Sequence, residues 1–503
     1  MSFQTFAGIE TEYGIAVPDD PSASPVVSSA RVVNAYRSVD RQWAGFDYSD
    51  EEPLQDARQP RLARDSSRFA LDDFGIPNLV LTNGARVYVD HAHPEYSSPE
   101  CASAYDLLRY EHAGDEIMRR AAVHASSQYP GAAILLYKNN IDGKGAAYGT
   151  HENYLIPRSV PFGALTQVLM PFFVTRSVFV GAGRTGSEHQ PDVAFQLTQR
   201  AEFFECEVGL ETTVRRGIMN TRDEPHADPS RYRRLHVING DANMCEVAGF
   251  LKVGTMMLVL DAYIAGYLTD LPVLLDPVQA FHHQSHDLTL NFAHMLESGK
   301  TATALGIQTI YRDACAAYIA AERSPDSEAS RVLTLWSRIL DDAANNPQRL
   351  VGRVDWATKQ NLITAYMARN NCAATDARVQ LIDLQYHDLR HEHGLYYRLR
   401  QHGRVERILT DEAIETAITT APTNTRAYFR GESIRHFSQA IIAAGWDAMV
   451  FSNGNSGHTR VTMPDPQFGT AAHTADLFAA HDTVDAFLAD LLSSPERTAI
   501  SLG

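Results

Sequence analysis

The segment GIETEYG, close to the N-terminus, places two carboxylates on the same side of a predicted strand. Alternate side chains of a strand point to opposite faces, so Glu10 and Glu12 share one face while Ile9 and Thr11 share the other. Carboxylates in this arrangement are candidate ligands for a hard cation. A solvated strand face above an apolar core explains this short segment equally well.

The segment NGARVYVDHAHPEY repeats the separation of polar from apolar side chains. Its polar face carries Arg86, Tyr88 and Asp90, and its apolar face carries Val87 and Val89. One face therefore packs on a core, while the other lines solvent or a site. A residue that precedes proline avoids the helical region, so His93 is extended and we expect Glu95 just beyond the strand end. An edge strand with ordinary turn histidines is the alternative.

Two later segments, HENY and RRLHVI, show the same pattern, with His151 beside Asn153 and Arg234 beside His236. Each histidine alone is more often a structural residue than a ligand. Together with three oxygen ligands, however, one or two imidazoles favour Mg²⁺, which prefers few carboxylates plus phosphate oxygens and water. These oxygen ligands are Glu10, Tyr88 and Glu95. Arg86 and Arg234 would then bind phosphates through bidentate, charge-assisted hydrogen bonds.

The glycine pattern GAGRTG (181–186) matches GxGxxG but does not predict a dinucleotide site. The residues after it, SEHQPDV, contain Pro191 and do not open a helix within a βαβ unit, so we predict a flexible loop. The Walker A sequence GxxxxGK[ST] does not occur in the chain. A nucleotide, if one is bound, must therefore lie on a sheet.

The composition is typical of a globular protein that does not bind nucleic acid. The 503 residues include 44 Lys and Arg against 61 Asp and Glu, a formal charge of -17, which disfavours a general nucleic-acid surface. No apolar run approaches the roughly 18 residues of a membrane span, and the first residues lack the basic and apolar regions of a secretory signal. The five isolated cysteines have no zinc-ligand spacing. We expect a cytoplasmic protein with reduced cysteines and neither a nucleic-acid nor a membrane partner.

The elements expected around these segments form an α+β fold. Strand-like runs cover 3–17, 85–91, 133–137, 152–156, 202–209 and 235–239, and helices are expected over 105–124, 165–179 and 244–268. Residues 303–369 are predominantly helical and predict a helical cap. Residues 41–77 are polar and aperiodic, which predicts a long mobile loop. We place a catalytic domain at 1–424 and a small C-terminal domain at 425–503.

Several long segments closely resemble the Dop/PafA family, whose members act on the small protein modifier Pup. These segments are GIETEYGI, NGARVYVDHAHPEYSSPEC, LYKNNIDGKGAAYGTHENYLIP, NTRDEPHADPSRYRRLHVINGDANM and TRAYFRGE. The resemblance extends from Gly8 to at least Trp446. The run DHAHPEYSSPE and the insertion at 41–77 are similar to the depupylase branch, Dop, rather than to the ligase branch, PafA.

This resemblance implies a glutamine synthetase-like fold, in which a curved antiparallel sheet is backed by helices and followed by a small C-terminal α/β domain. It implies an enzyme that uses ATP (or ADP or phosphate) and Mg²⁺ to deamidate the C-terminal glutamine of Pup and to cleave the isopeptide bond between Pup and pupylated proteins. We expect it to work as a monomer, with the tail of Pup in a groove that leads to the nucleotide.

The resemblance also assigns roles to residues. Asp90 corresponds to the catalytic aspartate. The metal-site residues are Glu10, Tyr88, Glu95, His151 and His236. The nucleotide contacts are Arg86, Ser98, Arg234 and Trp446. Spacing alone gives no reason to choose Trp446, and nothing physical separates Ser98 from Ser97.

The sequence leaves several alternatives open. Asp90 either attacks the carbonyl directly or acts as a general base on water. A PafA-like Pup ligase, a small-molecule ligase of the glutamine synthetase or glutamate–cysteine ligase type, and an inactive Pup-binding scaffold are the competing functions. Arg200, Arg222 and Arg233 are candidates for the groove. The polar insertion lies just before the catalytic strand, which motivates the hypothesis that it gates the site.

Overall fold

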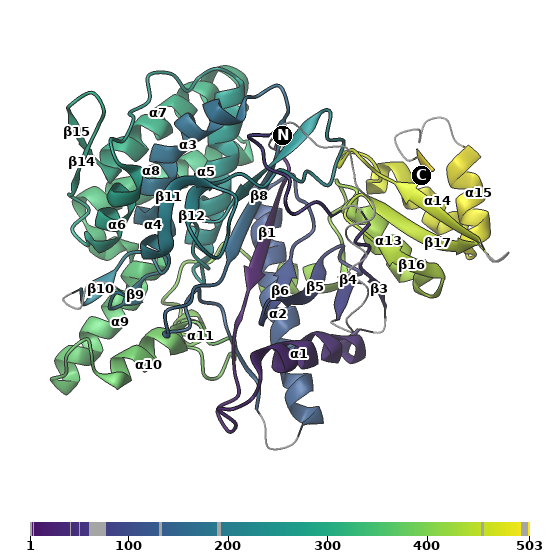
Figure 1. Cartoon of the computed structure of the whole chain (residues 1–503), viewed down its shortest axis with the longest axis horizontal. Coiled ribbons are helices and arrows are strands. Elements are labelled where there is room, and N and C mark those ends of the chain that lie inside the picture. The colour runs from purple at the N-terminus through teal and green to yellow at the C-terminus, as the bar shows by residue number, and fades with distance from the viewer. Residues whose placement is uncertain are drawn as a thin grey trace.

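The computed structural model describes residues 3, 5–40, 42–49, 51–59, 77–129, 133–188, 193–453, 457–493 and 501–502. A seven-stranded sheet lies at its centre, with the strand order β13-β8-β1-β6-β5-β4-β3 and every neighbouring pair antiparallel (Figure 1). In that order the strands are Tyr232–Val237, Thr150–Pro157, Ala7–Glu12, His93–Ser97, Arg86–Asp90, Asn78–Leu81 and Trp43–Gly45. The predicted α+β fold with an antiparallel sheet is confirmed.

Helices cover the apolar face of this sheet. That face presents five side chains that are at most 1% exposed: Ile9, Val87, Tyr96, Tyr154 and Leu235. Helix α2 (Ala104–Gln128) packs on β1 and β6, while α1 (Pro25–Val39) and α5 (Glu246–Ile264) pack on α2. Gly114 permits the close approach, because a Cβ there would lie 2.3 Å from the ring of Tyr96. Burying each such apolar side chain contributes about 1.5–3 kcal/mol.

Helix α5 corrects the expectation that no apolar run is long enough to span a membrane. It has 19 residues with a mean hydropathy of 1.6, which meets the length and composition of a span. However, 89% of this stretch is buried inside the protein. An apolar helix surrounded by protein is a core helix, since its apolar surface is already removed from solvent.

The remaining helices extend the same core away from the sheet (Figure 1). They are α3 (Phe162–Thr175), α4 (Ser177–Val180), α6 (Pro277–His286), α7 (Ala304–Glu322), α8 (Glu328–Asn345), α9 (Asp355–Asn370), α10 (Ala377–Tyr386), α11 (Leu395–Gln401) and α12 (Asp411–Thr419), with short 3-10 turns at Ala201–Phe203 and Pro347–Leu350. The predicted helical region at 303–369 is confirmed as α7 to α9. Its buried side chains belong to the same hydrophobic cluster as the sheet.

Small two-stranded sheets complete the large unit. They pair β2 (Gly14–Ala16) with β7 (Leu135–Tyr137), β9 (Arg184–Thr185) with β10 (Phe195–Gln196), β11 (Phe204–Gly209) with β12 (Arg216–Asn220), and β14 (Ala293–Met295) with β15 (Thr301–Thr303). The single strand predicted over 3–17 is therefore two strands, β1 and β2, which pair in different sheets.

The C-terminal unit has its own sheet and core and lies beside the β3 edge of the central sheet (Figure 1). It comprises α13 (Ala427–Phe437), a 3-10 turn (Ser438–Ala440), β16 (Ile441–Ala444), β17 (Ala448–Asn453), β18 (Gly457–Thr462), α14 (Ala471–Ala480), α15 (Val484–Ser493) and β19 (Ser501–Leu502). Its hydrophobic cluster also contains Ala44, Phe46 and Val80 from the edge of the central sheet. The two units therefore share a packed boundary.

The first part of the predicted 41–77 loop is structured. Strand β3 pairs with β4, and Phe46 packs edge to face on Trp446 with ring centroids 6.3 Å apart. The aromatic and apolar residues in this stretch are buried against the C-terminal unit. A prediction from the polarity of the local sequence does not include this tertiary contact. Residues 60–76, on which the gating hypothesis also depends, lie outside the described residues.

The GAGRTG segment is pinned rather than flexible. The Gly183 carbonyl accepts a hydrogen bond from Lys359 Nζ at 2.6 Å, and the Thr185 N–H donates to Asp383 at 2.6 Å. Gly183 has φ +65 and lies so close to Trp356 that a Cβ would meet its backbone at 2.9 Å. Gly181 and Gly183 therefore serve tight packing, since a Cβ at Gly181 would lie 2.3 Å from the Leu197 carbonyl oxygen. The segment forms no βαβ nucleotide site.

Candidate functional site

Strand register gathers the predicted polar residues on one face of the central sheet. Glu10 lies opposite Ser97 on one neighbouring strand and His151 on the other. Glu95 lies opposite both Glu12 and Tyr88. Cross-strand partners share a face, so the side chains form one continuous polar surface. Glu95 is thus inside β6, not beyond the end of β5 as expected, because His91 and Ala92 reverse the chain in a tight hairpin.

One group on this surface centres on Glu10. Its carboxylate accepts a hydrogen bond from Asn153 Nδ2 at 2.9 Å and lies 3.3 Å from His151 Nδ1, and Asn153 Oδ1 lies 2.9 Å from His236 Nδ1. Burial alone would raise the pKa of Glu10, but the hydrogen bond from His151 and the charges of His236 and Arg234 lower it well below its usual value. Burial and Arg234 lower the pKa of His236. The group therefore brings together one carboxylate and two imidazoles, all of which are possible metal ligands.

A second group contains Glu12, Asp90 and Glu95, whose carboxylates lie within 4.8 Å of one another. The Gly149 N–H donates to Glu12 at 2.8 Å, and a Cβ at Gly149 would lie 2.6 Å from that carboxylate. Burial raises the pKa of Glu95 well above its usual value, and the negative charges of Asp90, Glu12 and Glu10 raise it further. Clustered buried carboxylates of this kind are stable when a cation compensates them.

The donor set fits Mg²⁺. Glu10, His151 and His236 place one ligand atom each within 4.8 Å of one another, and the carboxylate group beside them adds hard oxygen donors. Tyr88, which is also predicted as a metal-site residue, lies opposite Glu95 on the same face. Burial raises the pKa of its phenol, as do the charges of Glu95 and Glu10, and its hydroxyl lies 3.3 Å from Ser97 Oγ. Glu12 was not assigned to the metal from sequence, although its strand alternation pointed to it.

Asp90 is the most accessible carboxylate of its group. Its side chain is 41% exposed, and its Oδ2 lies 2.9 Å from Nδ1 of the neighbouring His91. Burial tends to raise its pKa, but the hydrogen bond and charge of His91 lower it below the usual value. Asp90 is therefore ionised and reachable, as a nucleophile or general base must be.

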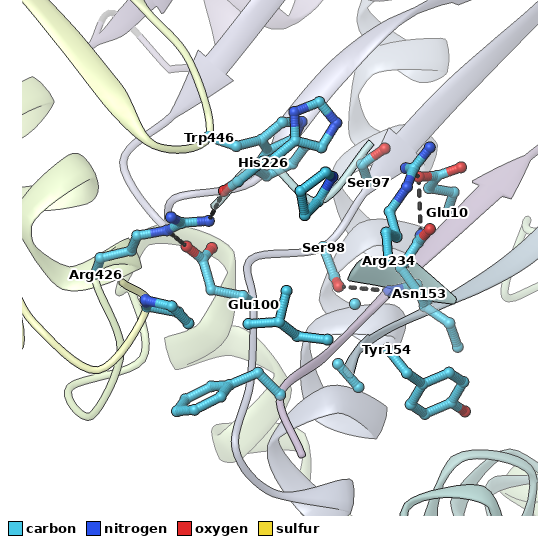
Figure 2. A pocket seen from close by; sticks show the side chains of 17 residues that line it. Glu10, Ser97, Ser98, Glu100, Asn153, Tyr154, His226, Arg234, Arg426 and Trp446 are labelled. Atoms are coloured by element: carbon cyan, nitrogen blue, oxygen red, sulfur yellow. Dashed lines mark hydrogen bonds and ion pairs between the residues drawn. The ribbon is translucent and has the colours of Figure 1, made fainter. Parts of the chain in front are cut away.

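A pocket adjoins the Glu10 group (Figure 2). Its lining includes Glu10 and Arg234 at one end and His226 and Trp446 at the other. Its other lining residues are Phe6, Ala7, Gly8, Ile9, Ser97, Ser98, Glu100, Asn153, Tyr154, Leu155, Pro225, Arg426 and Pro466. A pocket with an apolar part and a few polar groups is typical of a small-ligand site.

The structure places three of the four predicted nucleotide contacts in this pocket: Ser98, Arg234 and Trp446. Ser98 Oγ accepts a hydrogen bond from the Ile9 N–H at 3.0 Å and donates to the Pro99 carbonyl at 3.0 Å. It therefore holds the ends of two strands together. Arg86 is not part of the lining; its guanidinium lies 3.6 Å from the ring centroid of Phe46 and donates to Asn78 at 2.9 Å.

Two glutamates that sequence reasoning missed bind the arginines beside the pocket. Glu224 lies 2.9 Å from Arg222 and 3.4 Å from Arg234, and Glu51 lies 3.5 Å from Arg86. The charges of His226, Arg222 and Arg234 outweigh burial and lower the pKa of Glu224 to about 2. No motif links Glu51 to Arg86, and the periodicity of the strands does not indicate which carboxylate pairs with Arg234. Glu224 holds the side chain of Arg234 in place at the pocket.

The three candidate groove arginines lie in different environments. Arg222 is paired with Glu224, and Arg233 lies 5.9 Å from the ring centroid of Phe162. Arg200 is 1% exposed and donates to the Ile238 carbonyl at 2.6 Å. Within the described part of the chain, neither Arg200 nor the nearby Arg216 has a carboxylate within salt-bridge distance, and both interact electrostatically with Glu12. The charges of Arg200 and Arg216 therefore offset part of the negative charge of the carboxylates at the Glu12 end of the site.

Glu100 anchors the far end of the pocket. It lies 2.7 Å from Arg426 Nε and also forms an ion pair with Arg430. Burial alone would raise the pKa of Glu100, but the charges of Arg430 and Arg426 lower it from 4.5 to about 2. The pairing therefore stabilises the fold above pH 4.5, and this stabilisation is lost as the pH falls towards 2.

This shift predicts an acid-dependent difference between the wild type and Glu100→Gln. The free energy of unfolding of the wild type should fall relative to that of the variant by about 3 kcal/mol between pH 4.5 and 2. Denaturant titrations of both proteins at several pH values would measure this difference. Parallel curves for the two proteins would show that Glu100 is not held ionised by its arginines.

Known proteins resemble this chain in sequence. The family model described as Pup-ligase protein matches residues 5–450. A Pup deamidase/depupylase of Mycolicibacterium smegmatis is 46% identical over 495 residues, which cover 96% of this chain and 98% of the relative. A Pup–protein ligase of Actinosynnema mirum is 42% identical over 379 residues, covering 74% of this chain and 82% of the ligase. The match to the deamidase/depupylase thus spans more of both chains.

Solved structures resemble the fold over most of its length. The ligase PafA in its complex with Pup, a prokaryotic ubiquitin-like protein, superposes with a TM-score of 0.79 at 31% identity and covers 97% of this chain and 94% of its own. PafA in complex with ADP superposes with a TM-score of 0.73 at 34% identity and covers 80% of this chain and 89% of its own.

Proposed function

The chain belongs to the Pup-ligase protein family, and on that premise we propose that it is a nucleotide-dependent amidase and isopeptidase of the depupylase branch. It deamidates the C-terminal glutamine of Pup and cleaves the isopeptide bond between Pup and a lysine of a modified protein. The nearly full-length similarity to a Pup deamidase/depupylase supports this assignment over the ligase, which matches a shorter part of the chain.

One observation carries the catalytic part of the proposal. Asp90 is an accessible carboxylate on the same sheet face as Glu10, and Glu10 also lines the pocket. The pocket for a nucleotide therefore opens onto the surface that bears the reactive group. An ADP-bound relative of the same fold supports nucleotide binding in this chain.

The residues suggest a sequence of steps. In one route an Asp90 oxygen attacks the amide carbon, the C–N bond breaks, the amine departs with a proton from water, and water then hydrolyses the anhydride to restore Asp90. In the other route Asp90 removes a proton from the attacking water. Arg200 and Arg216 supply positive potential for the oxygen that gains charge.

Magnesium completes the proposal. Glu10, His151 and His236 would hold the ion, with Glu12 and Glu95 beside them. When bound, Mg²⁺ would neutralise these carboxylates and polarise phosphate or carbonyl oxygen. The chain's own residues set its position, since Asn153 orients Glu10 and the Gly149 N–H orients Glu12.

The ligase is the second candidate, because two solved structures that share the fold over most of this chain are those of PafA. The two activities give opposite results when a pupylated protein is incubated with the enzyme, ATP and Mg²⁺. Depupylation releases free protein and Pup, seen as loss of the conjugate band on a gel. Growth of conjugates from Pup that ends in glutamate would instead establish the ligase, and no change in either reaction would favour a scaffold or a small-molecule substrate.

The carboxylate groups predict that ADP and Mg²⁺ stabilise the protein together. At a concentration one hundred times the dissociation constant, a ligand adds about 2.7 kcal/mol to the free energy of unfolding. We expect a higher melting temperature with both ligands than with either alone, measured by differential scanning fluorimetry. Sodium chloride of equal ionic strength controls for salt, and equal stabilisation by ADP with and without Mg²⁺ would contradict the assigned metal site.

A further inference from the structure

The segment TRAYFRGE contains two buried arginines that no step of the proposed reaction uses. Arg430 is completely buried, and its guanidinium donates to the Gly84 carbonyl at 2.9 and 3.0 Å and to the Trp446 carbonyl at 2.7 Å. The Cζ atom of its guanidinium also lies 5.1 Å from the centroid of the Trp446 ring. The side chain of Arg430 therefore contacts the β4–β5 turn, Glu100 and the β16–β17 turn at the same time.

Arg426 makes the complementary set of contacts. It donates to the Met463 carbonyl at 2.7 Å and to the His226 carbonyl at 2.6 Å, while its Nε binds Glu100 at 2.7 Å (Figure 2). His226 has φ 46, a left-handed conformation that is rare for a residue with a side chain. The hydrogen bond from Arg426 helps to hold that strained backbone in place.

Glu100 thus lies between two arginines, each of which holds one wall of the pocket. Arg430 holds the wall that carries Trp446, and Arg426 holds the wall that carries His226. Both walls line the pocket, and Trp446 belongs to the C-terminal unit. The planar guanidinium is suited to this task because it presents several donors in a fixed geometry.

We infer that Arg430 and Glu100 are positioning residues that set the spacing of the Trp446 and His226 walls and thereby tie ligand binding in the pocket to the docking of the C-terminal unit. The inference deepens the proposed function, since it rests on this pocket being the nucleotide site. Neither residue is a catalytic residue. Arg430 acts through the main chain of Trp446, and Glu100 acts through the side chains of Arg430 and Arg426.

The test compares Arg430→Lys with the wild type. Lysine retains the charge but lacks the fork of donors, so we expect ADP affinity in the presence of Mg²⁺ to fall about tenfold, with kcat at saturating nucleotide unchanged. Arg435→Lys is the matched control, because Arg435 lies on the same helix, binds Glu432 at 3.1 Å and does not line the pocket. Unchanged ADP affinity in Arg430→Lys, or an equal loss in the control, would overturn the inference.

Two further readouts separate this inference from general destabilisation and from failure of the proposed function. If Arg430 acts through Trp446, Arg430→Lys in a Trp446→Phe background should cost less ADP affinity than in the wild type, whereas additive losses would refute the coupling. The emission of Trp446, obtained by subtracting the spectrum of each Trp446→Phe counterpart, should shift to longer wavelength in ligand-free Arg430→Lys. An unshifted spectrum would contradict the positioning role of Arg430, whether or not the wild type binds ADP. Absence of ADP binding by the wild type would instead contradict the assignment of this pocket as a nucleotide site.

Discussion

Asp90→Asn is expected to reduce the hydrolysis of Pup amide bonds by at least about 10³-fold in kcat, while ADP affinity and melting temperature stay near those of the wild type. Asparagine has the same shape but provides neither a nucleophilic carboxylate nor a general base. Its side chain lies at a partly exposed hairpin end, where it contributes little packing. Removal of one of three clustered negative charges should, if anything, ease the repulsion that acts on Glu95.

The measurement is single-turnover cleavage of a pupylated protein, followed on gels, together with calorimetric titration of ADP. Asp313→Asn serves as a matched control because Asp313 is an exposed aspartate on α7 that forms an ion pair with its neighbour Arg312. Wild-type turnover in Asp90→Asn would remove Asp90 from the mechanism. Loss of ADP binding together with turnover would assign it to the ligand site instead.

Glu10→Ala is expected to lower Mg²⁺-dependent ADP affinity by about 10- to 100-fold, in the range found when metal-site residues are removed. Glu10 is the carboxylate shared by the histidine group and the pocket, and it also binds Asn153 and lies 3.7 Å from Arg234. Its loss removes a metal ligand and also removes one of the two carboxylates beside Arg234, which keeps its ion pair with Glu224.

Calorimetry with ADP in the presence and absence of Mg²⁺ separates these two effects. The metal-dependent gain in affinity should disappear in Glu10→Ala, and the affinity without metal should change little. Glu322→Ala provides a control, since Glu322 hydrogen-bonds to Tyr267 at an exposed position on α7. An unchanged metal-dependent gain in Glu10→Ala would show that the metal assignment is wrong.

The polar face of the sheet was predictable because strand periodicity is local. Alternation along GIETEYG indicated that Glu10 and Glu12 share a face of their strand, and alternation along NGARVYVD indicated the same for Tyr88 and Asp90. Both statements hold in the structure, where the two pairs lie on the same face of the sheet. Register between strands is not local. The placement of Glu95 inside β6 depends on a two-residue hairpin at His91, whose left-handed backbone leaves no signal in the residue type.

Partners brought together by tertiary folding could not be predicted. Glu224 binds the pocket residue Arg234, Glu51 binds Arg86, and Glu100 binds Arg430 across 330 positions of sequence. Trp446 was assigned from family resemblance alone, because its position is set by the docking of the C-terminal unit on the sheet edge. The burial of β3 and the enclosure of the apolar helix α5 are likewise tertiary effects. The polar composition of 41–77 predicts a loop where β3 forms, and the apolar run that forms α5 was overlooked in the sequence.

The most direct test of the central claim is the intact mass of Pup ending in glutamine after incubation with the purified protein, ADP or ATP, and Mg²⁺. The account predicts conversion of the glutamine amide to a carboxylic acid, seen as the corresponding mass increase, which Asp90→Asn does not catalyse. Unaltered Pup in the presence of wild-type enzyme, nucleotide and metal would contradict the assignment of this chain as a Pup deamidase.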